Sequence, residues 1–162
     1  MCVDGRECCF GKVVNTAVVL SETGAIVNEC WHSIRVSFPN VDLDDLVIMP
    51  NHLHCIILLN EENRRGLINQ TPTEDPCNGN WPLMRVPGIH LGKVIRYFKA
   101  KSARMIHLKG FPSFKWQRNY YEHVIRNNAD LERIRKYICN NPLQWALDEE
   151  NPDNLSPLKP RL

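Results

Sequence analysis

The chain has 162 residues, of which 43% are hydrophobic and 23% charged, with a formal net charge of +2; this is the composition of one ordinary globular domain. It contains neither a run of about 18 apolar residues nor a basic leader followed by an apolar stretch, so the sequence predicts no membrane span and no signal peptide, and we expect a cytoplasmic protein. Seven cysteines at irregular spacings, without a CxxC pair, argue against a disulfide framework and a zinc ribbon.

The first part of the chain predicts strands on both sides of one helix. The stretch GKVVNTAVVLSETG (11–24) indicates a short strand pair or a strand and turn, with the strongest β signal at VVL near residue 18. Ser21 is a helix N-cap residue, and the apolar residues after it recur at spacings of three and four, which predicts a helix over about residues 22–37. We expect a turn at FPNVDL, a strand over 45–49, a break at Pro50-Asn51 and a strand over 52–59.

The second part predicts a long connection and two helices. Residues 60–88 hold four prolines and three glycines without sustained periodicity, which favours a connection over a domain boundary. A helix is predicted from His90, with a mostly apolar stripe at Leu91, Ile95, Phe98, Ser102 and Met105. Residues 111–126 predict a loop that enters an irregular strand. Asn127-Asn128 can cap a helix through Asn140 that stops before Pro142. We expect one domain over 1–150 and a proline-rich tail over 151–162.

Charge is distributed unevenly along the chain. Residues 1–84 carry five Lys and Arg against eleven Asp and Glu, whereas residues 85–126 carry ten against the single acid Glu122. A basic stretch is often only a solvated helix face, but this one is interleaved with aromatic residues. Basic side chains neutralise phosphates and exposed aromatic rings stack on unpaired bases, so the combination favours nucleic acid, single-stranded more than duplex.

His52 and His54 stand in an otherwise apolar run, VIMPNHLHCIILL (47–59). Side chains of a strand alternate between its faces, so the two imidazoles share one face, roughly 6 to 7 Å apart. Two neutral imidazoles at that spacing can bind one divalent ion. For the HxH pattern alone, chance is the more common explanation.

A metal ion needs at least a third ligand, and the late helix offers one. Tyr137 and Asn141 are four residues apart and therefore share a helix face. A tyrosine at the edge of an apolar stripe is more often a core residue than a catalyst. Yet an amide oxygen from Asn141 would complete a His, His, Asn set beside a phenol, with positions left open for water or phosphate oxygens.

The chain resembles the tyrosine-dependent HUH transposases of bacteria, most closely those associated with repetitive extragenic palindromes. The resemblance runs over nearly the whole chain and includes GRECCFG and GKVIRYFKAKSARMI. Its specificity comes from three motifs in order, namely HLH (52–54), WQRNYYEHVIR (116–126) and YICNNP (137–142). In that family the two histidines and a polar residue of the late helix hold the metal, and the tyrosine four residues before that polar residue is the nucleophile.

The resemblance implies an enzyme, a metal-dependent single-stranded DNA endonuclease and strand transferase. It would form a 5′-phosphotyrosine intermediate and act in transposition or in processing of hairpin-containing repeat elements, with Mg²⁺ or Mn²⁺ as cofactor. Tyr137 would be the nucleophile, and His52, His54 and Asn141 would hold the metal. The expected DNA-binding residues are Lys93, Arg96, Lys99, Arg104, Trp116, Arg118 and Arg126. Tyr120 and Tyr121 are rival nucleophiles, and His123 is a candidate general base by position only.

The implied fold is α+β, with a ferredoxin-like antiparallel sheet of about four strands, helices on its faces and the HUH histidines on a central strand. Family members begin with a full strand ahead of the GREC-like segment, so we expect that strand to be truncated here. A missing central strand would expose backbone groups along an edge. The oligomeric state is expected to be monomer or homodimer.

Two other functions compete with this interpretation. A histidine-triad nucleotide hydrolase uses His-x-His-x-His, but the third position here is Ile56. A non-catalytic protein that binds hairpin or single-stranded DNA, a decayed transposase, would use the basic and aromatic residues alone.

Overall fold

A computed structural model describes residues 1–60 and 90–155 of the chain. The connection expected over 60–88, except Asn60, and the end of the expected tail lie outside these residues. Among the helices described, none has the length and apolar character that crossing a membrane requires. All six cysteines within the described ranges are free thiols.

The secondary structure is mixed, and the expected α+β class is confirmed. Two antiparallel two-stranded sheets are formed, one by β1 (Gly11–Val14) and β2 (Ala17–Leu20) and the other by β3 (Val41–Ile48) and β4 (Leu53–Leu59). The α-helices are α1 (Glu22–His32), α2 (Ile34–Ser37), α4 (Leu91–Leu108) and α5 (Asn128–Gln144). Short 3₁₀ helices are η1 (Asp4–Arg6), η3 (Trp145–Leu147) and η4 (Pro152–Leu155).

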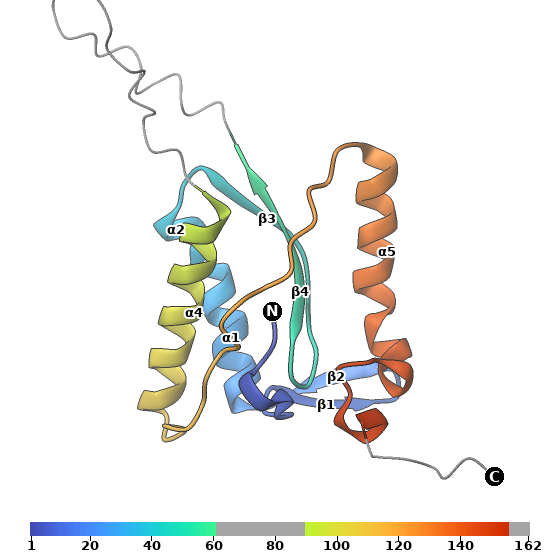
Figure 1. Ribbon diagram of the computed structural model, residues 1–162. Helices are drawn as coiled ribbons and strands as arrows, with labels where there is room; N and C mark the ends of the chain where they lie inside the picture. The colour runs from blue at the N-terminus through green and yellow to red at the C-terminus, as the bar shows by residue number, and fades with distance from the viewer. Residues whose placement is uncertain (61–89, 156–162) are drawn as a thin grey trace, which may run out of the picture.

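The β3–β4 hairpin separates two helical layers (Figure 1). Helices α1 and α4 pack side by side on one face, and α5 stands on the other. The main core lies on the α1–α4 side, where Trp31 of α1 meets Phe98 of α4 edge to face, with ring centroids 6.0 Å apart. Both rings are almost fully buried. Burial of such large aromatic side chains provides much of the free energy that holds the two helices on the hairpin.

The expected cap of the first helix is confirmed, and the helix is divided in two. The Ser21 hydroxyl accepts a hydrogen bond from the Gly24 amide at 3.1 Å, which satisfies one of the free amides at the start of α1. At Ser33 the chain passes from α1 into the single turn α2. Phe38 to Asn40 then make the turn, so β3 begins at Val41, four residues before the expected strand.

Two expectations about the later helices are wrong. The inward face of α4 is shifted, because Val94 and Ile106 are buried whereas Met105 is 39% exposed. The helix packs against α1 on one side and the aromatic residues 114 and 116 on the other, which moves the buried stripe around its axis. Helix α5 does not stop before Pro142 but runs through it to Gln144, since the fixed φ of proline is helical and only one backbone hydrogen bond is forgone.

Helix α5 is fixed to the hairpin by an ion pair. A β-bulge interrupts the β3–β4 register between Leu43 and Leu46, and Asp44 within it accepts from the Arg135 guanidinium at 2.7 and 3.1 Å. Bulges redirect side chains out of the regular alternation. The contact holds the central turn of α5, and with it Tyr137 two residues later, over the face of the hairpin.

The N-terminal residues bridge β4 and the segment before Gln117. Leu53 donates to the carbonyl of Met1 at 2.9 Å, and Gln117 donates to the carbonyl of Cys2 at 2.9 Å. Single antiparallel bridges join Cys2 to His52 and Val3 to Trp116. Residues 111–126 contain no assigned strand beyond that bridge. A single four-stranded sheet is therefore not shown, only two small sheets with bridges between segments.

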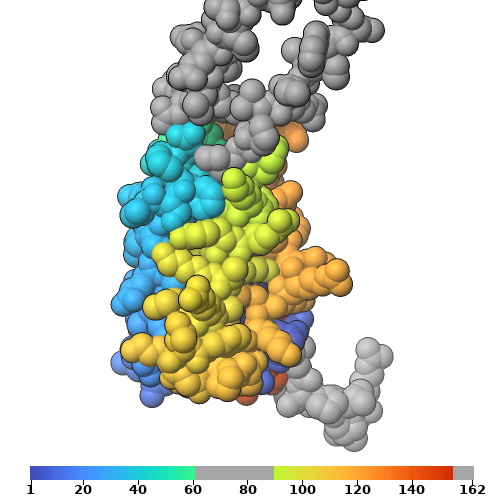
Figure 2. Space-filling model, turned by 90° about the vertical axis from the view of Figure 1, so that its left-hand side faces the viewer, coloured from blue at the N-terminus to red at the C-terminus, as the bar shows by residue number. Residues whose placement is uncertain are grey.

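Seen from the side of α4, that helix runs down the middle of the molecule (Figure 2). Helices α1 and α2 flank it on one side and the segment after Lys115 flanks it on the other.

Candidate metal and nucleophile site

The two histidines are held by a tight and buried connection between β3 and β4. Met49 donates to the carbonyl of His52 at 2.8 Å, which closes a four-residue turn. The carbonyls of Pro50 and Asn51 accept from Phe10 and Val3 at 2.9 and 2.8 Å, so the turn keeps its backbone bonds without water. His52 and His54 leave it on one face, with ring centroids 4.9 Å apart.

All four residues expected at the centre of the site line one cavity of about 750 Å³. Tyr137 and Asn141 reach it from α5. The Tyr137 ring meets the His54 ring edge to face, with centroids 5.2 Å apart. Asn141 is 3% exposed and Tyr137 is 50% exposed, so the amide is enclosed while the phenol is accessible. The i, i+4 relation of the two residues does bring both to the histidines.

Asn51 sets the orientation of His52, a role that the sequence did not predict. The sequence indicated Asn51 only as part of the break between two strands. Its amide group donates to the carbonyls of Arg6 and Glu150 at 3.1 and 2.7 Å. Carbonyls only accept, so the Asn51 oxygen must be the atom that faces His52 Nδ1, at 2.9 Å. Nδ1 therefore carries the proton, and the lone pair of neutral His52 lies on Nε2.

Two buried atoms in the cavity lack a hydrogen-bond partner. They are His52 Nε2 and Asn141 Oδ1, the only such side-chain atoms among the residues that the structure describes. Buried polar atoms are nearly always paired, so each exception requires an explanation. Both atoms are of types that bind divalent ions. Imidazole and amide donors thus fit a metal ion at this position.

Asn141, the expected third ligand, is of a residue type outside the usual metal-binding clusters. Within 1–60 and 90–155, no group of three or more His, Cys, Asp or Glu side chains is arranged to hold a metal ion. A site here therefore needs the Asn141 amide as well as the two imidazoles.

Burial keeps both histidines neutral. Desolvation, followed by the nearby His54, lowers the pKa of His52 to about 3. Desolvation also lowers the pKa of His54 to about 4. An imidazole must be unprotonated to bind a metal, so at neutral pH neither ring has to lose a proton first.

Tyr137 keeps its proton at neutral pH. Burial raises the pKa of Tyr137, the charge of Asp148 raises it further, and the Asn141 side chain opposes both. The phenol would therefore need a cation nearby to act as an oxyanion.

Asp148 is a second residue that the sequence analysis missed. It follows η3 and lines the same cavity, with Oδ2 3.8 Å from His52 Nε2. The sequence WALDEEN gives no local signal for this contact, because it joins residues far apart in the chain.

The opposite wall of the cavity comes from the segment before α5 and includes Gln117, Asn119, Tyr120 and Tyr121. Lys99 fixes this segment, since its Nζ donates to the carbonyls of Gln117 and Asn119 at 2.8 and 3.0 Å. Tyr121 is 89% exposed. Both rival tyrosines thus line the cavity with Tyr137.

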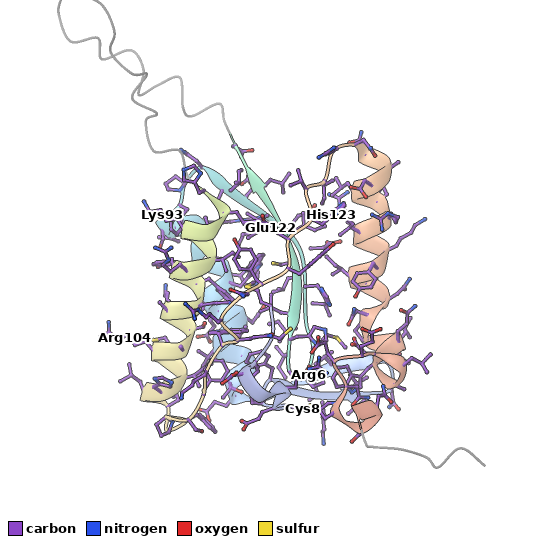
Figure 3. All side chains as sticks on the ribbon, viewed as in Figure 1. Arg6, Cys8, Lys93, Arg104, Glu122 and His123 are labelled. Atoms are coloured by element: carbon purple, nitrogen blue, oxygen red, sulfur yellow. The ribbon has the colours of Figure 1, made fainter. Side chains whose placement is uncertain are left out.

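His123 does not lie in the cavity wall. Its Nε2 is 2.9 Å from Asp130 Oδ2, beside the N-terminal turn of α5. Figure 3 shows it on the segment that leads into that helix. His123 therefore does not share the cavity with Tyr137, and its position gives no support to a role as general base.

The expected DNA-binding residues fall into three groups. Lys93 and Arg104 are exposed on the outer side of α4 and point away from α5 (Figure 3); Arg96 is exposed on the same helix. Arg118 and Arg126 are exposed on the segment that passes the cavity.

Trp116 and Lys99 have structural contacts instead. The Trp116 ring packs against Phe10, Phe98 and Phe114 with centroids 5.2 to 5.7 Å away. Its indole N–H donates to the Ser102 hydroxyl at 2.9 Å. Trp116 is therefore packed into the core rather than presented for base stacking.

Comparison with known proteins gives one informative relative. A protein of Haemophilus influenzae, described as uncharacterized, is 35% identical over 152 residues, which cover 92% of this chain and 81% of the relative. No family model matches the chain. No solved structure matches it.

Proposed function

We propose that this chain, which belongs to the same protein family as the Haemophilus influenzae relative, is a metal-dependent single-stranded DNA endonuclease and strand transferase of the HUH type. The observation that carries the proposal is the pair of buried unpaired atoms, His52 Nε2 and Asn141 Oδ1, in one cavity with an accessible phenol. A surface that only binds DNA would not require two unpaired atoms of metal-binding type beside a tyrosine.

The proposed cofactor is Mg²⁺ or Mn²⁺, held by His52, His54 and Asn141. When bound, such an ion polarises a phosphate oxygen and stabilises negative charge near it. The protein contributes two imidazoles that stay neutral through burial and an enclosed amide oxygen that is kept free of other partners.

Tyr137 is the proposed nucleophile. Its oxygen attacks the phosphorus of one phosphodiester, the bond from phosphorus to the 3′ oxygen breaks, and the tyrosine proton ends on that 3′ oxygen. The products are a 5′-phosphotyrosine and a free 3′-OH. The phosphotyrosine linkage keeps the energy of the phosphodiester, so another 3′-OH can reverse the step and join a new strand. This would serve transposition or the processing of hairpin-containing repeats.

The cavity's second wall is the proposed path of the single strand. Exposed Tyr121 can stack on an unpaired base, and Arg118 and Arg126 on the same segment can neutralise phosphates. Lys99 contributes by fixing this segment. Lys93, Arg96 and Arg104 belong to a separate face and are proposed only as contacts for a hairpin stem that extends beyond the cavity.

The bridges made by residues 1–3 support the ferredoxin-like arrangement. They place these residues between β4 and residues 115–117. We propose that this order, with β3 outermost, corresponds to a four-stranded antiparallel sheet that has the histidines on a central strand.

The test uses one single-stranded hairpin DNA with the label at either end, incubated with Mn²⁺ and analysed on a denaturing gel. Attack by tyrosine on the 5′ phosphate predicts that the 3′-labelled product migrates with the protein, and that the 5′-labelled product is a shorter free strand. The adduct should disappear in Tyr137→Phe and persist in Tyr121→Phe, the matched change on the opposite wall.

Other outcomes would contradict the proposal. Tight hairpin binding without any adduct would indicate the non-catalytic DNA-binding function instead. Cleavage of duplex DNA as readily as of single strands would contradict the single-strand assignment.

A further inference from the structure

We propose that the cavity beside Tyr137 holds an unpaired adenine of the DNA and reads it with the side-chain amides of Gln117 and Asn119, an inference that rests on the DNA binding of the proposed function. The cavity has a volume of about 750 Å³, within the range of pockets that enclose small molecules. It therefore has room for more than the phosphate that Tyr137 would attack.

The charges around the cavity favour a neutral group over a phosphate in the space away from the proposed metal position. No lysine or arginine lines the cavity within the described residues, whereas Asp148, Glu149 and Glu150 do. The two histidines add no positive charge, because burial keeps both neutral. Carboxylates repel a phosphodiester, so the sugar-phosphate backbone is expected outside the cavity, where Arg118 and Arg126 are exposed. The interior is then left for a base.

Gln117 and Asn119 present free amide groups to this interior. Both residues line the cavity, and neither side chain makes a hydrogen bond to any part of the chain that the structure describes. Their backbone is nonetheless fixed, because the Lys99 ammonium donates to the carbonyl of Gln117 at 2.8 Å and to that of Asn119 at 3.0 Å. A fixed backbone that carries free polar side chains lowers the entropic cost of binding a ligand.

Tyr121 supplies a flat surface next to these amides. Its ring is 89% exposed, whereas the Tyr120 ring has the Lys99 ammonium 5.8 Å from its centroid. An exposed aromatic ring stacks on any base, so Tyr121 contributes affinity without selectivity. Selectivity then depends on the amides and on the carboxylates of the cavity wall.

Adenine matches this lining better than the other bases do. The amide of asparagine or glutamine donates from its nitrogen and accepts at its oxygen, which complements the N7 acceptor and the N6 amino donor of adenine. Adenine also has no carbonyl oxygen, whereas guanine has O6 and thymine has O4. Carboxylates such as that of Glu149 repel these oxygens. Cytosine offers an amino group, but its O2 carbonyl meets the same repulsion.

The experiment measures binding of the full chain to hairpin DNAs in EDTA, where metal-dependent cleavage does not occur. Each hairpin carries four identical unpaired nucleotides on both sides, with adenine, cytosine, guanine, thymine or unsubstituted purine as the base. Purine has the rings of adenine without the amino group, so this comparison separates hydrogen bonding from stacking.

Fluorescence anisotropy gives the affinities of wild type, Gln117→Leu, Asn119→Leu and Asn128→Leu. Asn128 is exposed on the first turn of α5 and lies outside the cavity lining, so Asn128→Leu is the matched control. The wild type should bind adenine flanks at least about tenfold more tightly than purine or thymine flanks, the scale of one bidentate contact.

Gln117→Leu and Asn119→Leu should each reduce the ratio of adenine to purine affinity to under about threefold, and Asn128→Leu should preserve it. Affinity for thymine flanks should stay within about threefold of wild type in all variants, which shows that they are folded.

Equal wild-type affinities for adenine and purine flanks, or tighter binding of another base, would overturn the adenine site and leave the proposed function in place. An adenine preference that survives both amide replacements would overturn the assignment to Gln117 and Asn119. A preference that depends on these amides, in a protein that forms no covalent DNA adduct, would uphold the adenine site and defeat the proposed function. A wild type that binds none of the hairpins would contradict both.

Discussion

The side-chain oxygen of Asn51 accepts a hydrogen bond from Nδ1 of His52 at 2.9 Å. The same side chain joins the Arg6 and Glu150 carbonyls, so one buried residue connects the N-terminal turn, the strand that carries His54 and the segment after α5. Figure 3 shows Arg6 where these parts meet. This link gives the first prediction.

Asn51→Ala should destabilise the fold and weaken Mn²⁺ binding together. It removes one buried and two partly buried hydrogen bonds and leaves two carbonyls without that partner, which should lower the free energy of unfolding by roughly 2 to 4 kcal/mol in urea titrations. Loss of the orienting bond to His52 should weaken Mn²⁺ binding by about 10 to 100-fold.

The matched control is Asn154→Ala. Asn154 also donates to two carbonyls, those of Ala146 and Asp148, but it is exposed. Its replacement should therefore lower the free energy of unfolding by under about 1 kcal/mol. Nitrogen-15 NMR of the wild type should find the proton of His52 on Nδ1. A proton on Nε2 would contradict the orientation assigned to Asn51.

The second prediction concerns stability in acid. The pKa values of His52 and His54 are lowered from 6.5 to about 3 and about 4, so between these values and 6.5 the unfolded chain binds more protons than the folded one. The contribution of the two neutral histidines to the free energy of unfolding is complete above pH 6.5. It is lost progressively as the pH falls toward about 4 for His54 and about 3 for His52.

Lowering the pH from 7 to 5 should reduce the free energy of unfolding by on the order of 1 to 2 kcal/mol for each of the two histidines. Urea titrations at the two pH values measure the difference. His54→Gln should reduce that difference by the contribution of one histidine. His32→Gln, at an exposed position, should leave the difference unchanged. An equal difference in all three proteins would show that burial of His54 has no such effect.

The third prediction separates the two basic surfaces. Arg118→Gln, on the segment that lines the cavity, should weaken binding of unstructured single-stranded DNA. It should also reduce the slope of log affinity against log salt by about 0.7 for each phosphate that the protein no longer neutralises.

Arg104→Gln makes the same chemical change on the outer face of α4 and is the comparison. It should leave binding of unstructured strands nearly unchanged in fluorescence anisotropy titrations. A larger loss of affinity in Arg104→Gln than in Arg118→Gln would indicate that the single strand binds along α4 instead.

Local signals predicted most of the elements, and long-range packing decided the rest. The Ser21 cap and the β1–β2 pair depend on neighbouring residues and were predictable. The inward face of α4 was not, because α1 and the aromatic residues after α4 select Val94 and Ile106 over Met105. The end of α5 was also missed, since proline in a last turn costs one hydrogen bond that packing can offset.

For the site, regular periodicity predicted that His52 shares a face with His54 and that Tyr137 shares a face with Asn141. Each pair is local, with a spacing of two in a strand or four in a helix. Asn51 and Asp148 were missed because their roles depend on contacts across the chain; Asn51 and Glu150, for example, are 99 positions apart. The resemblance to HUH transposases was needed to join the two local pairs.

The most direct test of the central claim is the location of the covalent bond to DNA. After incubation with hairpin DNA and Mn²⁺, nuclease and trypsin leave a short nucleotide remnant on one peptide, which mass spectrometry identifies. Cleavage after Lys136 and Arg118 puts Tyr137 on the peptide 137–161 and the rivals Tyr120 and Tyr121 on the peptide 119–126. The proposal predicts the remnant on 137–161, at Tyr137; a remnant on 119–126 would contradict it.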